Sequence, residues 1–382
     1  MDDLLTRLTT IYDEEVARGA KAVAADDIPL NYESITPEWL THHLCKGVPG
    51  AKVVSHSLDD VDDGTTNRRR IFVEYNAEGK AAGLPASVFC KASQSLVHRY
   101  NNGNIGAVHA EVTFFDKVRP LVDGDVPTAY HAAYNPESFS SILVFEDIGA
   151  EVEFCDHTTT IDFEEACSQV DLLADIHGKF QDDPRYDKDT LNLGTWSSYF
   201  ASAAKNELQE YCDKGFLAAE AEIPSRLFAR AGEVWDATLA AVAEHDSLPQ
   251  TLVHGDCHLK QWYKRPNKSM GVADWQLASF GPWARDLPYM MATSLSVENR
   301  RAWEKQLIER YLDRLGRQGA RVPSFDEAFT LYRRNLLPAL AWWTVTLTPG
   351  PNYPDMQPPE TSLVFINRIT HAMDDLDVLD AF

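Results

Sequence analysis

His254-Gly255-Asp256-Cys257-His258-Leu259-Lys260-Gln261, followed later by Asp274-Trp275-Gln276, is the stretch that decides the fold. The apolar runs 251–253 and 270–273 lead into its two acidic residues. Such runs predict short strands that each end in a loop. The stretch therefore places Asp256 and Asp274 on two loops at strand ends.

Two acids on neighbouring loops are typical of phosphoryl transfer from ATP. One carboxylate orients and deprotonates an attacking hydroxyl, and the second holds the magnesium ion that bridges the phosphates. Two other interpretations stay open. Acids at strand ends often only form turns, and the His-x-Asp-x-His pattern of His254, Asp256 and His258 offers ligands for zinc or iron. No further His, Cys or Glu cluster lies nearby in the sequence to complete that metal site.

Length and composition limit the class of protein. A chain of 382 residues predicts two lobes, and 44% apolar residues are enough for a sizeable core. The net charge of −23 argues against nucleic acid or an anionic membrane as partner, because both require Lys/Arg patches. We expect a small-molecule partner.

The cysteines and the N-terminus predict a cytoplasmic protein. Six cysteines are scattered without a Cys-x-x-Cys pair, which favours reduced, buried thiols over disulfides or a zinc knuckle. Met1-Asp2-Asp3 is acidic and starts no apolar signal segment. No apolar run approaches the roughly 20 residues of a membrane span.

The segment 51–92 predicts a β-rich lobe. Two β-prone runs, 52–58 and 70–75, flank a turn that contains Gly64, Thr65, Thr66 and Asn67. Such a turn can offer backbone N–H groups and hydroxyls to phosphates. A third run, 86–92, contains Lys91 near its end.

A helix is predicted over 107–119, after a loop over 101–106. Glu111, Phe115, Val118 and Val122 share one helical stripe, so Glu111 belongs to the buried face. A strand lysine followed by an inward helix glutamate is the ion pair that places the lysine on the nucleotide phosphates in kinases.

The order of these segments resembles the aminoglycoside/choline-kinase-like phosphotransferases, and most of all their ecdysteroid-kinase-like branch. In that branch the metal motif often reads Asp-aromatic-Gln, as in Asp274-Trp275-Gln276. The resemblance covers roughly residues 50–380. It implies an α+β, bilobal protein-kinase-like fold with a small antiparallel β lobe and a larger, mainly helical lobe. The implied domains are an N-terminal helical extension (1–50), a nucleotide-binding lobe (51–148) and a catalytic, substrate-binding lobe (149–382).

The resemblance also implies roles for individual residues. Backbone groups of Glu146, Asp147 and Ile148 would bind adenine, and Lys91, held by Glu111, would neutralise phosphate charge. The cofactors would be ATP and Mg²⁺. Supporting roles fall to His254, which would brace the loop, to His258 and Gln276, and to Asp286, which would cap the following helix and tie the loops down.

One residue departs from the family pattern. Where the family has Asn five residues after the catalytic Asp, this chain has Gln261, whose stem is one methylene longer. Magnesium tolerates little geometric error. Two alternatives to an active kinase of apolar alcohols therefore stay open: a weakly catalytic nucleotide-binding pseudokinase that serves as a scaffold, and an aminoglycoside- or choline-type kinase.

Aromatic residues dominate the segments where the acceptor would lie. Residues 335–354 contain no acid, which favours an apolar or ring-containing alcohol over an aminoglycoside, although tryptophans at helical spacing are often core. The candidate pocket residues are Trp262, Tyr263, Trp283, Trp342, Trp343 and Tyr353.

Overall fold

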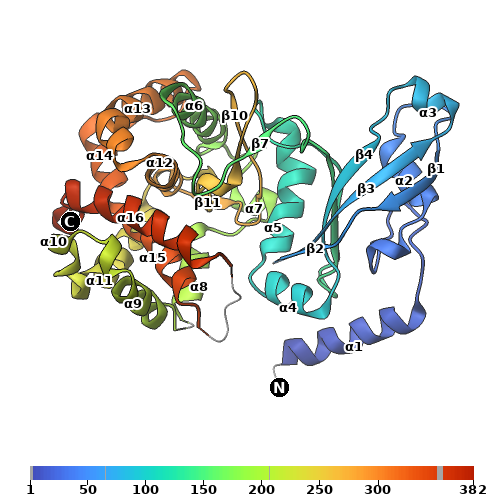
Figure 1. Cartoon of the computed structure of the whole chain (residues 1–382), viewed down its shortest axis with the longest axis horizontal. Coiled ribbons are helices and arrows are strands. Elements are labelled where there is room, and N and C mark those ends of the chain that lie inside the picture. Colours follow the sequence, from blue (N-terminus) through green and yellow to red (C-terminus); the bar gives the residue numbers. More distant parts are fainter. Residues whose placement is uncertain (1–2, 65, 206, 351–355) are drawn as a thin grey trace. The chain divides into compact units, whose positions relative to one another are not determined.

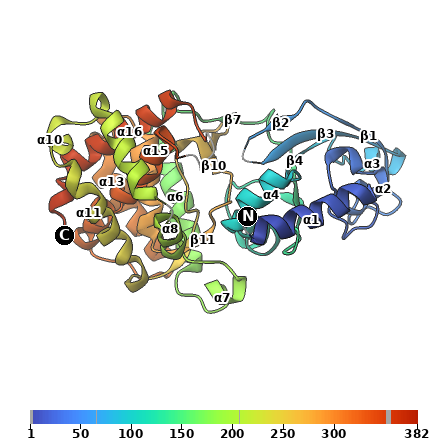
Figure 2. The same cartoon turned by 90° about the horizontal axis from the view of Figure 1, so that it is seen from below.

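The computed structural model describes residues 3–64, 66–205, 207–350 and 356–382. The chain divides into two compact units (Figures 1 and 2). The N-terminal unit comprises Met1–Leu121 and Pro127–Ala150, and the C-terminal unit comprises Val122–Val126 and Glu151–Phe382. Of the expected sites, Thr65 and Tyr353 lie outside the described residues.

An antiparallel sheet forms the centre of the N-terminal unit. Its strands run in the order β1 (Val53–Leu58), β3 (Asn67–Tyr75), β4 (Ser87–Ser93), β6 (Ser141–Glu146) and β5 (Ala129–Tyr134), with β2 (Asp62–Asp63) also paired to β3. The predicted hairpin and third strand are confirmed. Lys91 on β4 lies opposite Arg68 on β3 and Leu143 on β6, so it occupies a central strand.

Helices pack around this sheet. They are α1 (Asp3–Arg18), α2 (Pro37–Leu44), α3 (Ala77–Ala81), α4 (Leu96–Asn104) and α5 (Ala107–Thr113), which continues as a π-helical turn over Phe114–Val118. Thr36 caps α2 by accepting a hydrogen bond from the N–H of Trp39, as a Thr-Pro start predicts. Trp39 is fully buried among core residues of the sheet that include Ile71 and Val88.

The loop predicted over 101–106 is wrong for most of its length, because α4 extends to Asn104. Ser95 caps this helix. Arg99 on α4 is buried and forms a 2.6 Å ion pair with Glu15 of α1, a contact distant in sequence. The Asn- and Gly-rich composition suggested a loop, but this tertiary pairing overrides the local preference.

The C-terminal unit is mainly helical. Its short strands form two small sheets, β10 (Met270–Val272), β9 (Trp262–Lys264) and β7 (Glu153–Phe154) in one, and β11 (Ser279–Gly281) with β8 (Thr251–Val253) in the other. The longer helices are α6 (Phe163–Phe180), α8 (Trp196–Ala204), α9 (Leu208–Ala218), α11 (Ala231–Ala243), α12 (Leu287–Ser294), α13 (Val297–Arg317), α14 (Phe325–Arg334), α15 (Leu336–Leu347) and α16 (Pro359–Asp375). The predicted α+β class, with a small β lobe and a larger helical lobe, is confirmed.

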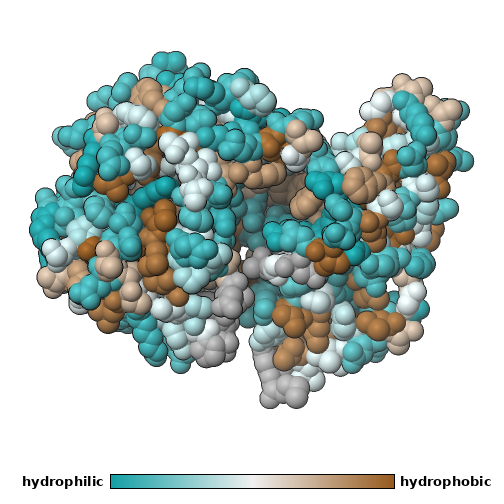
Figure 3. All heavy atoms as spheres, viewed as in Figure 1, coloured by the Kyte–Doolittle hydropathy of each residue, from teal (hydrophilic) through white to brown (hydrophobic). Residues whose placement is uncertain are grey.

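The C-terminal unit has a largely hydrophilic surface (Figure 3) and an apolar core. Hydrophilic residues cover much of the face of this unit that Figure 3 shows. Among the described residues, no helix is long and apolar enough to cross a membrane. One core cluster joins Trp196, Trp235 and Ala341 to Val253, the residue directly before His254. The candidate loop is thus attached to the packed interior of its unit.

Candidate active site

The loop that carries Asp256 is held by a buried carboxylate from another part of the chain. Asp286 accepts hydrogen bonds from the backbone N–H groups of His254 (2.6 Å) and Gly255 (2.9 Å). Its Oδ2 also lies 3.2 Å from Nε2 of His177, whose Nδ1 lies 2.7 Å from the hydroxyl of Tyr311. Asp286 is fully buried.

These contacts keep Asp286 ionised. Burial alone raises the pKa of this carboxyl, but the hydrogen bond with His177 and the charge of Arg285 outweigh burial and bring the pKa below its ordinary value. A buried charge with this many donors is a rigid anchor for the loop.

Asp286 does not cap the helix that follows it, so that prediction is wrong. It precedes α12, but its side chain makes no capping hydrogen bond there. The carboxylate instead accepts hydrogen bonds from the loop of Asp256, and this agrees with the second expected role, in which Asp286 fixes the loops in place.

His254 connects the two acidic loops. Its Nδ1 accepts a hydrogen bond from the N–H of Asp256 (3.2 Å), and its Nε2 lies 2.8 Å from the carbonyl oxygen of Ala273, the residue before Asp274. This pattern requires the proton on Nε2. Burial lowers the pKa of His254, so the ring is neutral at pH 7. The bracing role predicted for His254 has this geometric basis.

The same contacts speak against zinc or iron at His254, Asp256 and His258. Both ring nitrogens of His254 are already used within the protein. In the described part of the chain, no three His, Cys, Asp or Glu side chains are grouped so that they could hold a metal ion. The donor set therefore does not fit a closed zinc site.

Asp256 is half-buried and surrounded by hydrogen-bond donors. Tyr289 donates its hydroxyl to Oδ1 at 3.1 Å. On the other oxygen, Oδ2, Nε2 of Gln261 lies at 3.4 Å and Nε2 of His258 at 3.5 Å. Burial and the neighbouring Asp256 raise the pKa of Tyr289 well above its usual value, so its hydroxyl stays protonated and donates. The carboxylate is thereby fixed in orientation while part of it stays exposed.

Backbone conformation shapes both loops. Gly255 has a φ of +80°, and a Cβ there would collide with the carbonyl oxygen of Leu277. Asp274 has a φ of +58°, a left-handed conformation that few side chains other than Asn and Asp adopt readily. Such strain at a non-glycine residue is a recurrent property of functional sites.

In the N-terminal unit, the predicted lysine–glutamate pair is present. Nζ of Lys91 lies 2.9 Å from Oε1 of Glu111, and both side chains are nearly inaccessible to solvent. The helical stripe that placed Glu111 inward also holds, because Phe115, Val118 and Val122 are buried. Burying two charges requires desolvation free energy, which their attraction repays only when the geometry of the pair is excellent.

The expected phosphate turn is structured by α4. Asn67 uses its side-chain oxygen within the unit, 2.9 Å from Nδ1 of His98 and 3.0 Å from the N–H of Gln94. Nε2 of His98 lies 3.0 Å from the carbonyl oxygen of Gly64, and Thr66 is buried. These contacts fix the turn to the start of α4, and the N–H of Gly64 donates to the carbonyl oxygen of Thr66 at 3.0 Å.

The segment expected to bind adenine follows β6. Asp147 accepts hydrogen bonds from Arg70 (2.6 Å) and from the hydroxyl of Ser87 (2.7 Å), and Glu146 accepts one from the N–H of Thr128 (2.8 Å). Ile148 is buried. These contacts fix the segment at the end of β6 within the N-terminal unit.

The aromatic residues expected to line a substrate pocket are mostly core. Trp262 and Tyr263 are fully buried, and their polar atoms donate to Cys257 and Asp125. Trp283 is buried against Tyr311. We therefore do not assign these three residues to a substrate surface.

The two tryptophans of α15 also pack inside the unit. Trp342 is partly buried and packs on Tyr199 and Phe200. Trp343 is buried and contacts the ring of His258 at 5.0 Å between centroids. Gln276 is partly buried, and its amide nitrogen has no hydrogen-bond partner among the residues that the structure describes.

Sequence reasoning missed three residues of the site. Tyr289 contacts Asp256, and His177 contacts Asp286. Arg285 donates to the carbonyl oxygen of Gly255 at 2.7 Å. Tyr289 lies three residues after Asp286, a helical spacing that places both on one face. That spacing was the available signal. His177 was expected to pack or cap at the end of its helix. No local pattern indicated the contacts that His177 and Arg285 make here, because their partners are distant in sequence.

Comparisons with known proteins agree with this architecture. The family model of ecdysteroid kinase-like proteins matches residues 70–323. A structure described as a candidate aminoglycoside phosphotransferase of Ralstonia eutropha JMP134 shares the fold, with 14% identity, coverage of 89% of this chain and 96% of that chain, and a TM-score of 0.51.

Two further solved structures are more distant. Ethanolamine kinase of Plasmodium vivax has 10% identity, covers 85% of this chain and 82% of its own, and has a TM-score of 0.46. Choline kinase of Streptococcus pneumoniae has 14% identity, coverage of 85% and 94%, and a TM-score of 0.44. A search of curated proteins finds no match. Because the family match spans more than half of the chain, the protein belongs to the ecdysteroid kinase-like family of small-molecule kinases.

Proposed function

We propose that the protein transfers the γ-phosphoryl group of ATP to a hydroxyl group of a small molecule. The observation that carries this proposal is the setting of Asp256, a half-exposed carboxylate fixed by donors on both oxygens and mounted on a loop anchored by buried Asp286. A base must be oriented yet reachable, and this arrangement provides both properties.

In the proposed reaction, the acceptor hydroxyl oxygen forms a bond to the γ-phosphorus while the bond from that phosphorus to the β–γ bridging oxygen breaks. The hydroxyl proton passes to Asp256, and ADP leaves. Lys91, held by Glu111, neutralises phosphate charge, and backbone groups of Gly64, Thr66 and Asn67 contact the phosphates, while those of residues 146–148 contact adenine. Tyr289 and His258 keep the carboxylate of Asp256 oriented.

The donor set near Asp256 fits magnesium. Asp274 would supply a carboxylate oxygen, and Gln261, whose amide nitrogen faces Asp256, would supply its amide oxygen as a second hard ligand. Magnesium usually takes only one or two protein oxygens and completes its shell with water and phosphate oxygens. Bound there, the ion would neutralise charge on the β- and γ-phosphates.

The acceptor we propose is an apolar or ring-containing alcohol. His258, beside Asp256, packs against the buried rings of Tyr289, Trp343 and Phe365, so the loop of the base rests on an aromatic core. The name of the family points to a steroid alcohol for at least one member, which is a compound of this class. An aminoglycoside- or choline-type acceptor is the second candidate.

We also propose a cytoplasmic enzyme without nucleic acid or membrane partners. All six cysteines are buried free thiols, which suits a reducing compartment. The charge of −23 disfavours association with phosphate-rich surfaces.

The test is a phosphate-transfer screen of the full chain with ATP and Mg²⁺, read by mass shift. The panel holds steroid and aromatic alcohols, choline, ethanolamine and kanamycin. We expect transfer to a ring-containing alcohol. Asp256→Asn should lower turnover by about 10²-fold or more while ATP binding persists, because it removes the base and no phosphate contact. Asp313→Asn, on the exposed side of α13, is the matched control.

Three outcomes would count against the proposal. Turnover of Asp256→Asn within a few-fold of wild type would remove Asp256 from its role. Preference for kanamycin would favour the aminoglycoside-type alternative. Thermal stabilisation by ATP and Mg²⁺ without transfer to any acceptor would favour the pseudokinase scaffold.

A further inference from the structure

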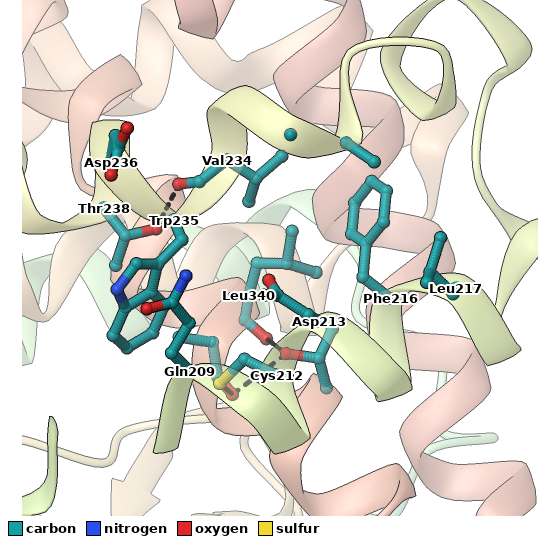
Figure 4. Close-up of a pocket in the computed structure, with 14 residues that line it drawn as sticks. Gln209, Cys212, Asp213, Phe216, Leu217, Val234, Trp235, Asp236, Thr238 and Leu340 are labelled. Atoms are coloured by element: carbon teal, nitrogen blue, oxygen red, sulfur yellow. Dashed lines mark hydrogen bonds between the residues drawn. The ribbon is translucent and has the colours of Figure 1, made fainter. Parts of the chain in front are cut away.

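The C-terminal unit contains a pocket that the proposed reaction does not use. It lies between α9 and α11, with α15 as its floor, and has a volume of about 320 Å³ (Figure 4). This volume is at the lower end of the range for small-molecule sites. Figure 4 shows Trp235 and Phe216 on two sides of the space, with Leu340 and Asp213 between them.

The floor of the pocket is apolar. Phe216, Trp235 and Leu340 are buried. The two threonines that line it use their hydroxyls inside their own helices, Thr238 on the carbonyl of Val234 and Thr344 on the carbonyls of Leu340 and Ala341. What they present to the pocket is therefore mainly methyl surface.

The rim of the pocket is acidic. Asp213 and Asp236 line it, both are exposed, and no lysine or arginine is among the lining residues. The nearest basic residue on α9, Lys214, forms an ion pair with Glu210 at 2.6 Å, and Arg230 before α11 is bound to Glu233 and Asp380. No lysine or arginine that lines the pocket therefore neutralises the carboxylates of Asp213 and Asp236.

The pocket walls are preformed. A Cβ on Gly215 would collide with the backbone of Thr344, so α9 and α15 are in direct backbone contact beside the pocket. Cys212, Trp235 and Ala341 belong to the hydrophobic cluster of the unit. A cavity fixed by such packing does not need to be opened by its ligand.

The pocket is separate from the loop of Asp256. On α15 it uses Leu340, Ala341 and Thr344, whereas Trp343, which contacts His258, lies on a different face of the helix. At 100° per residue, Trp343 is turned roughly 100° about the helix axis from the centre of the pocket face.

We propose that this pocket binds a small apolar amine in its protonated form. The apolar body would fill the floor, the aromatic rings of Trp235 and Phe216 would attract the cation, and Asp213 would pair with the ammonium group. An anion would face two carboxylates and no basic side chain in the pocket.

The test uses three probes with the same apolar body: phenylbutylamine, phenylbutanol and phenylbutyrate. Calorimetry with the full chain should give a Kd on the order of 1 mM or below for the amine, as expected for a ligand of its size. The alcohol should bind several-fold more weakly, and the carboxylate should not bind. Equal binding of all three, or no binding of the amine, would overturn the proposal.

Two variants place the binding in this pocket. Gly232 lines it, and a Cβ there would meet no atom within 4 Å, so Gly232→Leu adds apolar bulk at the pocket without a clash and should weaken amine binding. Asp213→Asn should weaken the amine by about 10-fold, with little effect on the alcohol. Asp313→Asn, an exposed acid on α13 outside the pocket, is the control and should leave binding unchanged.

A third variant separates the pocket from the proposed acceptor site. Asp256→Asn should bind the amine as the wild type does. Loss of amine binding in Asp256→Asn, together with retained binding in Gly232→Leu, would place the probe at the catalytic loop and overturn the assignment. The result does not depend on whether the protein transfers phosphate, because the readout is heat of binding.

Discussion

The carboxylate of Asp286 accepts a 2.6 Å hydrogen bond from the backbone N–H of His254, so a buried charge fastens the loop that carries the proposed base. The strength of this fastening can be measured directly, because an asparagine has the same shape without the charge.

Asp286→Asn should lower the free energy of unfolding by about 3 kcal/mol, since it leaves buried donors without their charged acceptor. It should also lower turnover more than ATP affinity, because it loosens the loop rather than the nucleotide site. Urea unfolding and ATP calorimetry check the two effects. Asp313→Asn, an exposed member of a helix-surface pair with Arg317, should change little. A loss of unfolding free energy below about 0.5 kcal/mol would mean that the hydrogen bonds of Asp286 do not stabilise the fold.

Lys91 and Glu111 should act as a unit in ATP binding. In a double-mutant cycle of Lys91→Ala and Glu111→Ala, we expect the two losses of ATP affinity to be strongly non-additive. Each charge is buried in an ion pair with the other, so removing either one already breaks the pair. The exposed pair Lys80 and Glu74, at 3.0 Å, is the control cycle and should give a coupling of about 0–1 kcal/mol. Additive losses at Lys91 and Glu111 would show that the pair does not position the lysine for the nucleotide.

Asp274→Ala should reduce the gain in ATP affinity that magnesium provides, because it removes a formal negative charge from the proposed ion site. The measurement is calorimetry with ATP alone and with ATP and Mg²⁺. Affinity for ATP alone should stay the same or rise. A magnesium-dependent gain equal to that of the wild type would assign the ion to another residue.

Gln261→Asn distinguishes an active kinase from a scaffold. If Gln261 reaches the ion with its amide oxygen, the shorter side chain should leave turnover similar or lower it, and it should raise the magnesium concentration required. If glutamine is instead an inactivating replacement, asparagine should raise turnover from near zero. We expect the first result. Gln306→Asn, at an exposed position of α13, controls for the substitution itself.

Stability of the N-terminal unit should fall with acidification because of two stacked histidines. The rings of His43 and His131 lie 3.7 Å apart, and burial lowers the pKa of His43 to about 3 and that of His131 to about 4. Unfolded histidine titrates near pH 6.5, so protons bind the unfolded chain first. Between about pH 7 and pH 5.5, unfolding should become easier by on the order of 1 kcal/mol per histidine.

Urea unfolding midpoints at these two pH values check this dependence. The double variant His43→Leu with His131→Leu should show a flatter dependence on pH than the wild type. His42→Leu, at the exposed neighbouring position, should keep the steep dependence. Equal slopes in all three proteins would mean that the stacked pair does not set the response.

The sequence predicted those parts of the site that depend on local order. The stripe of Glu111, Phe115 and Val118 placed Glu111 inward. Its pairing with Lys91 was expected from the order of segments in the kinase fold, not from periodicity alone. The loop of Asp256 followed from the runs of apolar residues before it.

Contacts between distant segments were not predictable in this way. The use of Asp286 on residues 254 and 255, rather than on its own helix, depends on tertiary packing that no local pattern encodes. The same holds for α4, where Arg99 forms an ion pair with Glu15. It also holds for Trp262 and Trp283, because periodicity alone cannot distinguish a buried core tryptophan from one that lines a pocket.

The composition of α15 has a consequence for how the chain is made. Its twelve residues carry no charge, and most are buried under α9, α11 and α16. Because α16 follows it in the chain, α15 leaves the ribosome before its last cover exists. During synthesis it is an uncovered apolar segment of the kind that associates with other chains. Yield in cells would therefore be sensitive to the speed at which residues 359–375 follow and dock.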